Sequence, residues 1–300
     1  MPRASVFRVR LSWVDLAILL AISLWSSNYI VSKAATDSVP PLAWNALRFS
    51  AAAVGFYILL RIAKVRLGIP RLLWWPLILS SLVSHAVYQP LFINGLHLTS
   101  ASNTVLIISI GPIWIIVFNA IRGQERITRG AVLGLFVALA GVIIVIIGRF
   151  AGQQETGGVG ITGDLLLVGC TIAWAGGVLL TRKPLQAGEP IVATFWMTVC
   201  GAASQLVIGT PALLGMDWRV ITPGILSAMF YSGVLCIAVG GVLFNFGVAQ
   251  IGTSRAAVFM YAQPFVTALL AVLFLNEQFT PLLIGGGVLI FIGVNLARRT

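Results

Sequence analysis

Apolar residues occur along this chain in long runs, separated by short polar or basic segments. A transmembrane helix needs about 20 mostly apolar residues. Allowing an error of a few residues at each end, the runs lie at residues 12–33, 41–61, 73–97, 101–121, 129–148, 162–181, 190–213, 223–250, 254–275 and 281–298. The pattern predicts an all-α membrane protein with ten transmembrane helices.

Two of the runs have recognisable first turns. Ser12 and Asp15 have the spacing of a capping box before the first run. Thr280 followed by Pro281 places an N-cap and a first-turn proline at the start of the last run. The apolar run after the basic N-terminus resembles a signal peptide. Because many similar runs follow it, we expect it to be retained as a membrane span.

Composition agrees with a membrane location, since 59% of residues are hydrophobic and 9% are charged, against roughly 25% charged in soluble domains. The net charge of +11 first suggests nucleic acid as a partner. However, most Lys and Arg residues fall in the segments on one side of the predicted spans. Because basic loops are usually cytoplasmic, this distribution indicates the membrane topology and predicts that both termini lie in the cytoplasm. The three cysteines lie inside apolar runs without metal-ligand spacing, so no metal or other cofactor is expected.

The two halves of the chain, residues 1–150 and 151–300, carry a repeated pattern. Asp15 and Trp25 correspond to Asp164 and Trp174 at an offset of 149 residues. At an offset of 152, further pairs are Leu91/Leu243, Phe92/Phe244, Ser102/Ser254, Pro112/Pro264, Glu125/Glu277, Gly134/Gly286 and Gly141/Gly293. Each half has five spans, an odd number, so the second half is predicted to be inverted relative to the first. Inverted repeats are typical of secondary transporters with a substrate site near the bilayer midplane.

The paired segments also resemble a known family. Residues 277–281 with 284–290 and Gly293-Val294, and residues 125–128 with Gly134 and Gly141-Val142, resemble the signature of the EamA-type drug/metabolite transporter superfamily. Residues 25–29 with Lys33, and Arg48-Phe49, are similar to it as well. The resemblance covers nearly the whole chain and is greatest to bacterial amino-acid exporters of the YddG kind. It implies a cavity lined mainly by spans one, three, four, six, eight and nine.

Span three carries the clearest polar stripe for such a cavity. Ser81, His85, Tyr88/Gln89 and Phe92 recur at spacings of three and four and so share a helix face. Pro90 is expected to kink this helix. The alternative is a polar face satisfied by neighbouring helices.

Other substrate-binding candidates come from the remaining central spans. Trp25 lies some 15 Å along its helix from Asp15, too deep for an interfacial anchor, and Trp174 is its repeat partner. The other candidates are Asn28, Tyr231, Asn245, Tyr261 and Gln263. The pair Gly240-Gly241 marks either a bending point or close helix packing. Pro112 and Pro264 are the stronger hinge candidates.

The charged side chains in or beside the predicted spans are expected to have structural roles. Arg48 is able to hold a substrate carboxylate, but the alternative, bonds to helix-end carbonyls, is preferred because the resemblance puts span two outside the cavity. Glu125 and Glu277 are expected to cap the helices that follow them.

These features predict a secondary transporter, not an enzyme, that exports small neutral or aromatic amino acids and related metabolites. Drug-like or other small metabolites are the alternative substrates, and a channel or intramembrane enzyme lacks its expected motifs. No Asp or Glu lies deep in a span, so coupling would be absent or would use His85. The expected partners are a small-molecule substrate and lipid, without nucleic acid. The protein is expected to be a monomer in a bacterial inner membrane.

Overall fold

The computed structural model describes residues 12–122, 129–151, 157–187, 189–251, 256, 259–277 and 280–298. Glu125 lies outside these ranges, as do the side chains of Pro112 and Tyr261. In the first half the helices are α1 (Trp13–Thr36), α2 (Pro41–Ile62), η1 (Arg71–Leu73), α3 (Trp74–Ser81), η2 (Leu82–Val87), α4 (Tyr88–Leu98), α5 (Ala101–Ile108), α6 (Gly111–Ile121) and α7 (Arg129–Ala151). In the second half they are α8 (Gly157–Ala187), α9 (Pro190–Gly215), η3 (Trp218–Val220), α10 (Pro223–Phe230), η4 (Tyr231–Val239), α11 (Gly240–Ile251), η5 (Met260–Ala262), α13 (Gln263–Leu275) and α14 (Pro281–Arg298).

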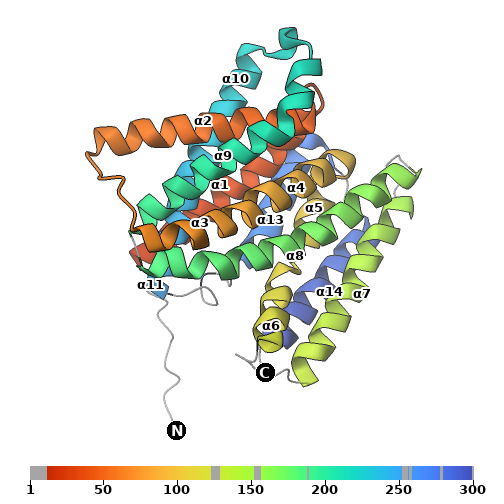
Figure 1. The fold of residues 1–300 in the computed structure, drawn as a ribbon. Coiled ribbons are helices and arrows are strands. Elements are labelled where there is room, and N and C mark those ends of the chain that lie inside the picture. The colour runs from red at the N-terminus through yellow and green to blue at the C-terminus, as the bar shows by residue number, and fades with distance from the viewer. Residues whose placement is uncertain are drawn as a thin grey trace.

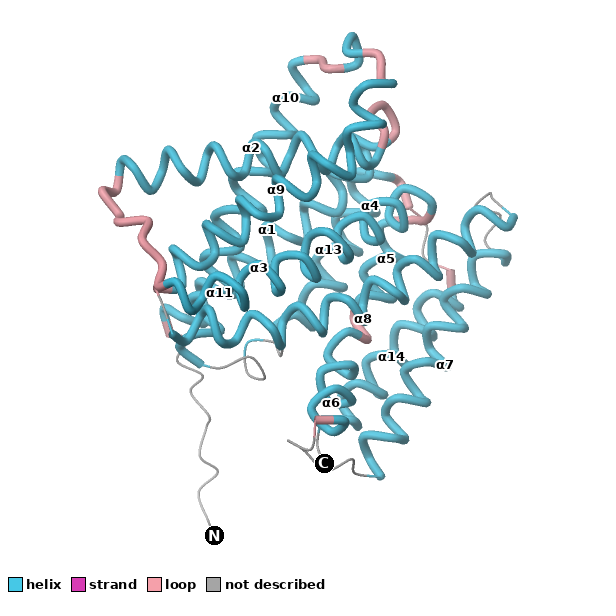
Figure 2. Tube along the Cα trace, viewed as in Figure 1, coloured by secondary structure: helices cyan, strands magenta, loops and turns pink. Residues whose placement is uncertain are grey.

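Helices account for all the regular structure of the described residues, as the tube in Figure 2 shows. Within these residues, seven helical runs are long and apolar enough to cross a membrane. Three shorter apolar helices, Val132–Val145, Gln263–Leu275 and Pro281–Gly293, fall in the three remaining predicted ranges. The prediction of an all-helical, multi-pass membrane protein is therefore confirmed, while ten crossings and the inversion of the halves stay predictions.

Both predicted helix starts are present. The Ser12 hydroxyl accepts a hydrogen bond from the Asp15 N–H at 3.2 Å, and the Asp15 carboxylate accepts one from the Ser12 N–H at 2.8 Å. The Thr280 hydroxyl accepts one from the Leu283 N–H at 3.1 Å. These bonds satisfy N–H groups that a helix leaves unpaired at its first turn.

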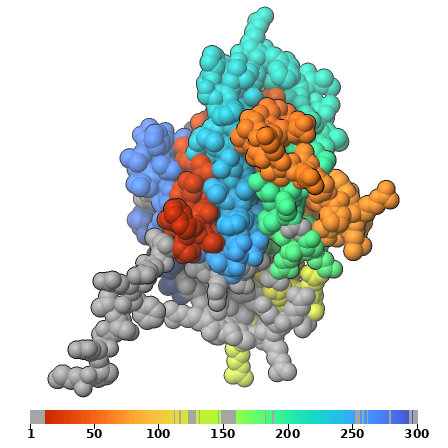
Figure 3. Space-filling view, turned by 90° about the vertical axis from the view of Figure 1, so that its left-hand side faces the viewer, coloured from red at the N-terminus to blue at the C-terminus, as the bar shows by residue number. Residues whose placement is uncertain are grey.

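The central helices pack around α1. Figure 3 shows α1 exposed between α11 on one side and α13 on the other, and it contacts both. Helix α2 packs along α9, and α4 packs along α8. Helices from both halves of the chain thus alternate around the middle of the molecule.

Helices α7 and α14 form a separate antiparallel pair at one side of the molecule (Figure 1). Their contact surface is made of glycines: a Cβ added at Gly286 would lie 2.8 Å from the Gly141 carbonyl oxygen, and one at Gly141 would lie 2.7 Å from the Ile290 nitrogen. No larger residue fits such a contact without separating the backbones, so Gly141 and Gly286 set the distance between the two helices.

Candidate functional site

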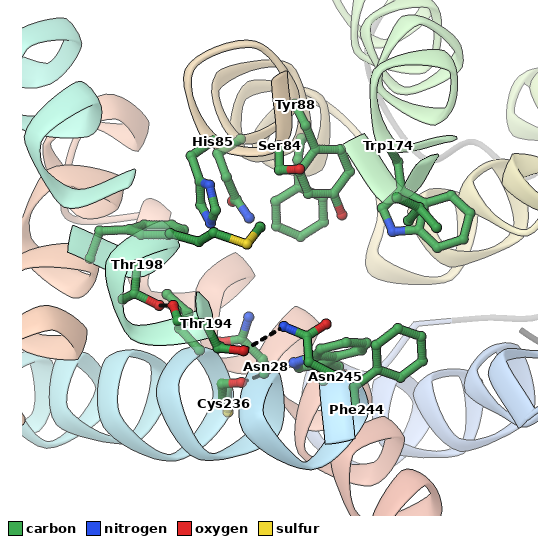
Figure 4. Close-up of a pocket in the computed structure, with 18 of the residues that line it drawn as sticks. Asn28, Ser84, His85, Tyr88, Trp174, Thr194, Thr198, Cys236, Phe244 and Asn245 are labelled. Carbon is green, nitrogen blue, oxygen red and sulfur yellow. Dashed lines mark hydrogen bonds between the residues drawn. The ribbon is translucent and has the colours of Figure 1, made fainter. Parts of the chain in front are cut away.

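A cavity of about 220 Å³ lies between the central helices, with walls from α1, α2, η2, α4, α5, α8, α9, η4, α11, η5 and α13. Figure 4 shows side chains converging on it from several of these elements, with His85 and Tyr88 on one wall, Trp174 on a second and Asn245 opposite. The structure places eight of the predicted substrate-binding residues in this lining, namely Trp25, Asn28, His85, Tyr88, Gln89, Trp174, Asn245 and Gln263.

The wall carrying His85 is a widened helix. Residues Leu82–Val87 form a π-helical turn, in which the Tyr88 N–H bonds to the Val83 carbonyl five residues back. In that register the His85 carbonyl would take its hydrogen from residue 90, but Pro90 has no N–H. The side-chain amide of Gln205, from α9, donates to the His85 carbonyl instead. Pro90 thus leaves the His85 carbonyl without a backbone donor in this register, and Gln205 supplies a side-chain donor.

Span eight is widened at the corresponding place. Residues Tyr231–Val239 form a π-helical segment in which the Gly240 N–H bonds to the Leu235 carbonyl, and residues 234–239 correspond to 82–87 at the offset of 152. Here the Trp25 indole N–H donates to the Cys236 carbonyl at 2.9 Å. The repeat therefore preserves a widened turn that accepts a side-chain donor from another helix, and such turns often occur at functional sites.

The π-helical segment also explains why Tyr231 does not lie where the sequence predicted. Tyr231 was expected to share the cavity face with Asn245, but its side chain is not part of the lining, and its hydroxyl lies 2.6 Å from the Ser27 hydroxyl. The expectation assumed a continuous α-helix between the two residues. A wide turn adds a residue and rotates one end of the helix relative to the other, which turns Tyr231 away.

His85 is oriented by three neighbours. Its Nδ1 lies 3.1 Å from the Ser81 carbonyl oxygen. A carbonyl oxygen only accepts, so Nδ1 carries a proton and Nε2 of the neutral ring is an acceptor. The Phe49 ring lies edge-on at 5.3 Å between centroids. Gly201 leaves room for the ring, because a Cβ there would lie 2.7 Å from His85 Cδ2.

Arg48 also lines the cavity, although span two was expected to lie outside it. Its side chain is 1% exposed. The prediction that it bonds to helix-end carbonyls is wrong. Instead, the guanidinium donates to side-chain oxygens from its own helix and from three others. It lies 5.5 Å and 5.8 Å from the ring centroids of Phe49 and Phe92. Its acceptors are Asn45 Oδ1 (2.8 Å), Ser32 Oγ (3.4 Å), Ser232 Oγ (3.3 Å) and Gln89 Oε1 (2.8 Å).

Two amide groups in the lining are left with unused hydrogen-bonding atoms. Gln263 is 5% exposed, and no hydrogen bond joins its side chain to another described residue. The Asn245 amide N–H donates to the Thr194 hydroxyl at 2.9 Å (Figure 4), which leaves Asn245 Oδ1 as an acceptor. Buried polar groups are normally paired, so these atoms are suited to a bound molecule.

Aromatic rings supply the apolar part of the lining. The Trp25 and Phe244 rings lie 4.9 Å apart between centroids, and the Tyr88 and Phe92 rings stack at 5.8 Å. Trp174, on α8, packs on the chain where α6 begins, because a Cβ at Gly111 would lie 2.9 Å from its ring. The lining thus combines one cation, several amides and aromatic rings.

The predicted hinge prolines lie where the helices are interrupted. Helix α5 ends at Ile108 and α6 begins at Gly111, with Pro112 in its first turn. Likewise, η5 is followed by α13, with Pro264 in its first turn. Pro90 follows η2, and the pair Gly240-Gly241 begins α11 directly after η4, with Gly241 in the cavity lining. The helix breaks are therefore present, and motion about them stays a prediction.

Glu277 caps a helix, but not the one expected. Asn276 adopts a left-handed conformation (φ 52°) at the end of α13, which an asparagine tolerates well. The Glu277 carboxylate then accepts from the Ala101 and Ser102 N–H groups, at 2.8 Å and 3.1 Å. It caps α5, in the other half of the chain, and not α14. The negative charge lies at the positive end of the α5 dipole.

Sequence reasoning missed the contribution of α9. Thr194, Met197 and Thr198 line the cavity, although the family resemblance implied that span seven does not. Their spacing of three and four was a usable signal, since Gly201 and Gln205 continue the same stripe of small or polar residues.

Comparison with known proteins agrees with this architecture. A family model described as the EamA-like transporter family matches residues 12–147 and 161–299. The transporter YvbV of Bacillus subtilis is 28% identical over 94% of this chain and 91% of its own length. A probable amino-acid metabolite efflux pump of Escherichia coli is 25% identical, over 92% and 91%. A probable terminal-alkyne amino-acid exporter of Streptantibioticus cattleyicolor is also 25% identical, over 97% and 95%.

A solved crystal structure, 21% identical, superposes with a TM-score of 0.69 and covers 96% of each chain. This likeness concerns the fold. The family match covers both halves and nearly the whole length, so the chain belongs to the EamA-like transporter family and is a multi-pass membrane transporter, not an enzyme.

Proposed function

We propose that this transporter exports small neutral or aromatic amino acids and related metabolites through the central cavity by alternating access. The observation that carries the proposal is the lining itself. It combines aromatic rings with amide groups around the single cation Arg48, and no Asp or Glu of the described chain lines it. Such a site suits a small amphipathic molecule with a carboxylate.

The other classes of substrate fit this lining less well. A nucleotide-sugar or sugar phosphate would require several Lys or Arg residues to match its charge. A drug-like organic cation would favour a carboxylate in the cavity. Two relatives with similar coverage are named for amino acids, as a probable metabolite efflux pump and a probable exporter, which supports amino acids over both.

Alternating access would use the two halves as inverted repeats. The widened turns at Leu82–Val87 and Tyr231–Val239 occur at equivalent positions, and so do the helix starts at Pro112 and Pro264. Paired irregularities of this kind are expected where two inverted repeats form one site near the midplane. One chain supplies both repeats, so the working unit is a monomer with both termini in the cytoplasm, in a bacterial inner membrane.

The experiment that tests the proposal is uptake of labelled L-phenylalanine and L-leucine into proteoliposomes, with a nucleoside and an organic cation as comparison substrates. Trp174→Ala removes an aromatic wall of the cavity, and we expect it to lower saturable amino-acid flux by about tenfold or more, as loss of a buried aromatic contact does at many binding sites. Trp218→Ala is the matched control, because Trp218 is 57% exposed and lies in η3, outside the lining.

Flux of the nucleoside or the cation without amino-acid flux would refute the substrate class. Equal flux in the two tryptophan variants would refute the cavity as the binding site. Proton coupling is tested separately by measuring flux against pH in His85→Ala, which should flatten the profile if His85 is the coupling group.

A further inference from the structure

The buried guanidinium of Arg48 has no acidic neighbour in the cavity. Its four hydrogen bonds go to neutral side-chain oxygens, and no carboxylate of the described residues lines the same space. Burying a charge without an opposite charge is unfavourable. From this arrangement, and resting on the proposed function, we infer that Arg48 is the binding site for the carboxylate of the transported molecule and that Gln89 occupies that site when it is empty.

Counting donors identifies which part of Arg48 is available. A guanidinium has five N–H groups, of which Nε is bonded to Asn45 and Nη1 to the two serines. On Nη2, one N–H is bonded to Gln89, and the other has no hydrogen-bond partner among the described residues. Both N–H groups of Nη2 are therefore the ones that a ligand oxygen is able to reach.

The acceptors of Arg48 differ in their freedom to move. Asn45, Ser32 and Ser232 are fully buried, and the Asn45 amide is further held by donating to the Gln89 carbonyl at 3.0 Å. Gln89 is half-buried, and its side chain lines the cavity. Three acceptors thus fix the guanidinium in place, and the fourth is exchangeable.

Exchange of Gln89 Oε1 for a ligand carboxylate is favourable on two grounds. A carboxylate has two acceptor oxygens and is able to use both N–H groups of Nη2, whereas Gln89 Oε1 uses one. The incoming carboxylate also supplies the missing negative charge. A preformed, buried cation of this kind discriminates strongly against an analogue that lacks the carboxylate.

The rest of the lining fits the remaining parts of an α-amino acid. His85, one turn before Gln89 on the same helical run, has Nε2 free to accept, and Asn245 offers Oδ1. These neutral acceptors suit an ammonium group without adding charge. The Trp25 and Phe244 rings provide an apolar wall for a side chain. The carboxylate is consequently the group with the largest electrostatic contribution to recognition.

Gln89→Glu tests this inference with little change in shape. The new carboxylate would lie against Arg48 Nη2, occupying the site permanently, and the resulting ion pair keeps Arg48 in place so that folding is retained. Gln250→Glu is the matched control, because Gln250 is exposed at the end of α11, outside the lining.

The measurement is equilibrium binding of three probes to the full-length protein in lipid nanodiscs. L-Phenylalanine has both charged groups, 3-phenylpropionate has only the carboxylate, and phenylalaninol lacks it. In the wild type and in Gln250→Glu we expect the two carboxylates to bind about tenfold or more tightly than phenylalaninol, the scale of a hydrogen bond to a charged group. In Gln89→Glu the preference should disappear.

Other results would overturn the inference. Equal binding of phenylalaninol and the carboxylates by the wild type excludes Arg48 as the anchor, and so does an unchanged preference in Gln89→Glu. Binding of none of the three probes also overturns it. Because amino-acid flux is measured separately, a wild type that transports L-phenylalanine but shows no carboxylate preference leaves the proposed function standing and removes only the role of Arg48.

Discussion

The α7–α14 pair and the helices around the cavity are built from similarly apolar sequence, yet they pack in opposite ways. Helices α7 and α14 are regular and approach each other at glycines, so that backbone touches backbone. The cavity helices are interrupted by the π-helical segments and by the breaks before Pro112 and Pro264. Regular helices with small residues close a gap, whereas widened helices with polar side chains keep one open.

The difference has an energetic basis. In an apolar medium, a backbone group without a hydrogen bond is costly. The glycine contact leaves every helical bond in place. The widened turns do not leave every helical bond in place. Side-chain donors from other spans bond to backbone carbonyls there instead, Gln205 to His85 and Trp25 to Cys236. We therefore expect different kinds of substitution to disrupt the two regions.

The largest effect is expected at the glycine contact. Gly286→Leu would force α7 and α14 apart and destabilise the protein by about 3 kcal/mol, the upper part of the usual range for overpacking. Gly285→Leu is the matched control, because a Cβ at Gly285 meets nothing within 4 Å. Thermal unfolding followed by size-exclusion chromatography measures both. Equal loss of stability in the two variants would contradict the account of this contact.

The next effect is expected at the widened turn of span three. Gln205→Leu removes the donor to the His85 carbonyl and leaves that buried group unpaired, at a cost of about 1–3 kcal/mol. Unlike Gly286→Leu, it should also lower amino-acid flux per folded molecule, because the wall that carries His85 moves. A stable variant with normal flux would show that the turn does not depend on Gln205.

A smaller effect is expected where the two halves are joined by a helix cap. Glu277→Gln keeps one of the two acceptor oxygens that receive the Ala101 and Ser102 N–H groups, loses the other, and removes the charge at the α5 dipole. The charge alone is worth about 0.3–1 kcal/mol. Glu189→Gln is the control for a charge at a helix start without cap bonds, since Glu189 is the N-cap of α9 and its side chain makes no cap bond. The unfolding midpoint should fall further in Glu277→Gln; identical midpoints would refute the stabilising role of the Glu277 cap.

The smallest change in stability is expected at Pro264, in the first turn of α13, where proline is well tolerated. Pro264→Ala should alter stability by less than about 0.5 kcal/mol, as uncrowded sites usually do. If the break before α13 acts as a hinge, the variant should nevertheless transport more slowly. Initial rates in proteoliposomes measure this, and a wild-type rate would exclude the hinge.

Much of the fold could be predicted from the sequence because a bilayer limits the choices. Run length alone located the helical segments, and the Ser12 and Thr280 caps followed from their side chains. The cavity face of span three was also predictable, because His85, Gln89 and Phe92 keep helical spacing across the end of the widened turn.

Other features could not be predicted because they depend on residues distant in sequence. Arg48 takes its acceptors from its own helix and from three others, including Ser232, 184 residues away. Tyr231 is turned from the cavity by a π-helical segment that periodicity does not show. Glu277 caps a helix of the other half instead of its neighbour. Each of these outcomes is decided by which helices pack together.

If the transporter works by alternating access, its cavity is reached in turn from both sides of the membrane. Labelling of a single cysteine at position 84, in the cavity lining, tests this most directly. Cys170, Cys200 and Cys236 are first replaced, and Ser84→Cys is treated with a membrane-impermeant maleimide from either side. Val207→Cys, on an exposed apolar face, is the control. Alternating access through this cavity requires labelling from both sides and protection by L-phenylalanine. Labelling from one side only, or no protection, would contradict it.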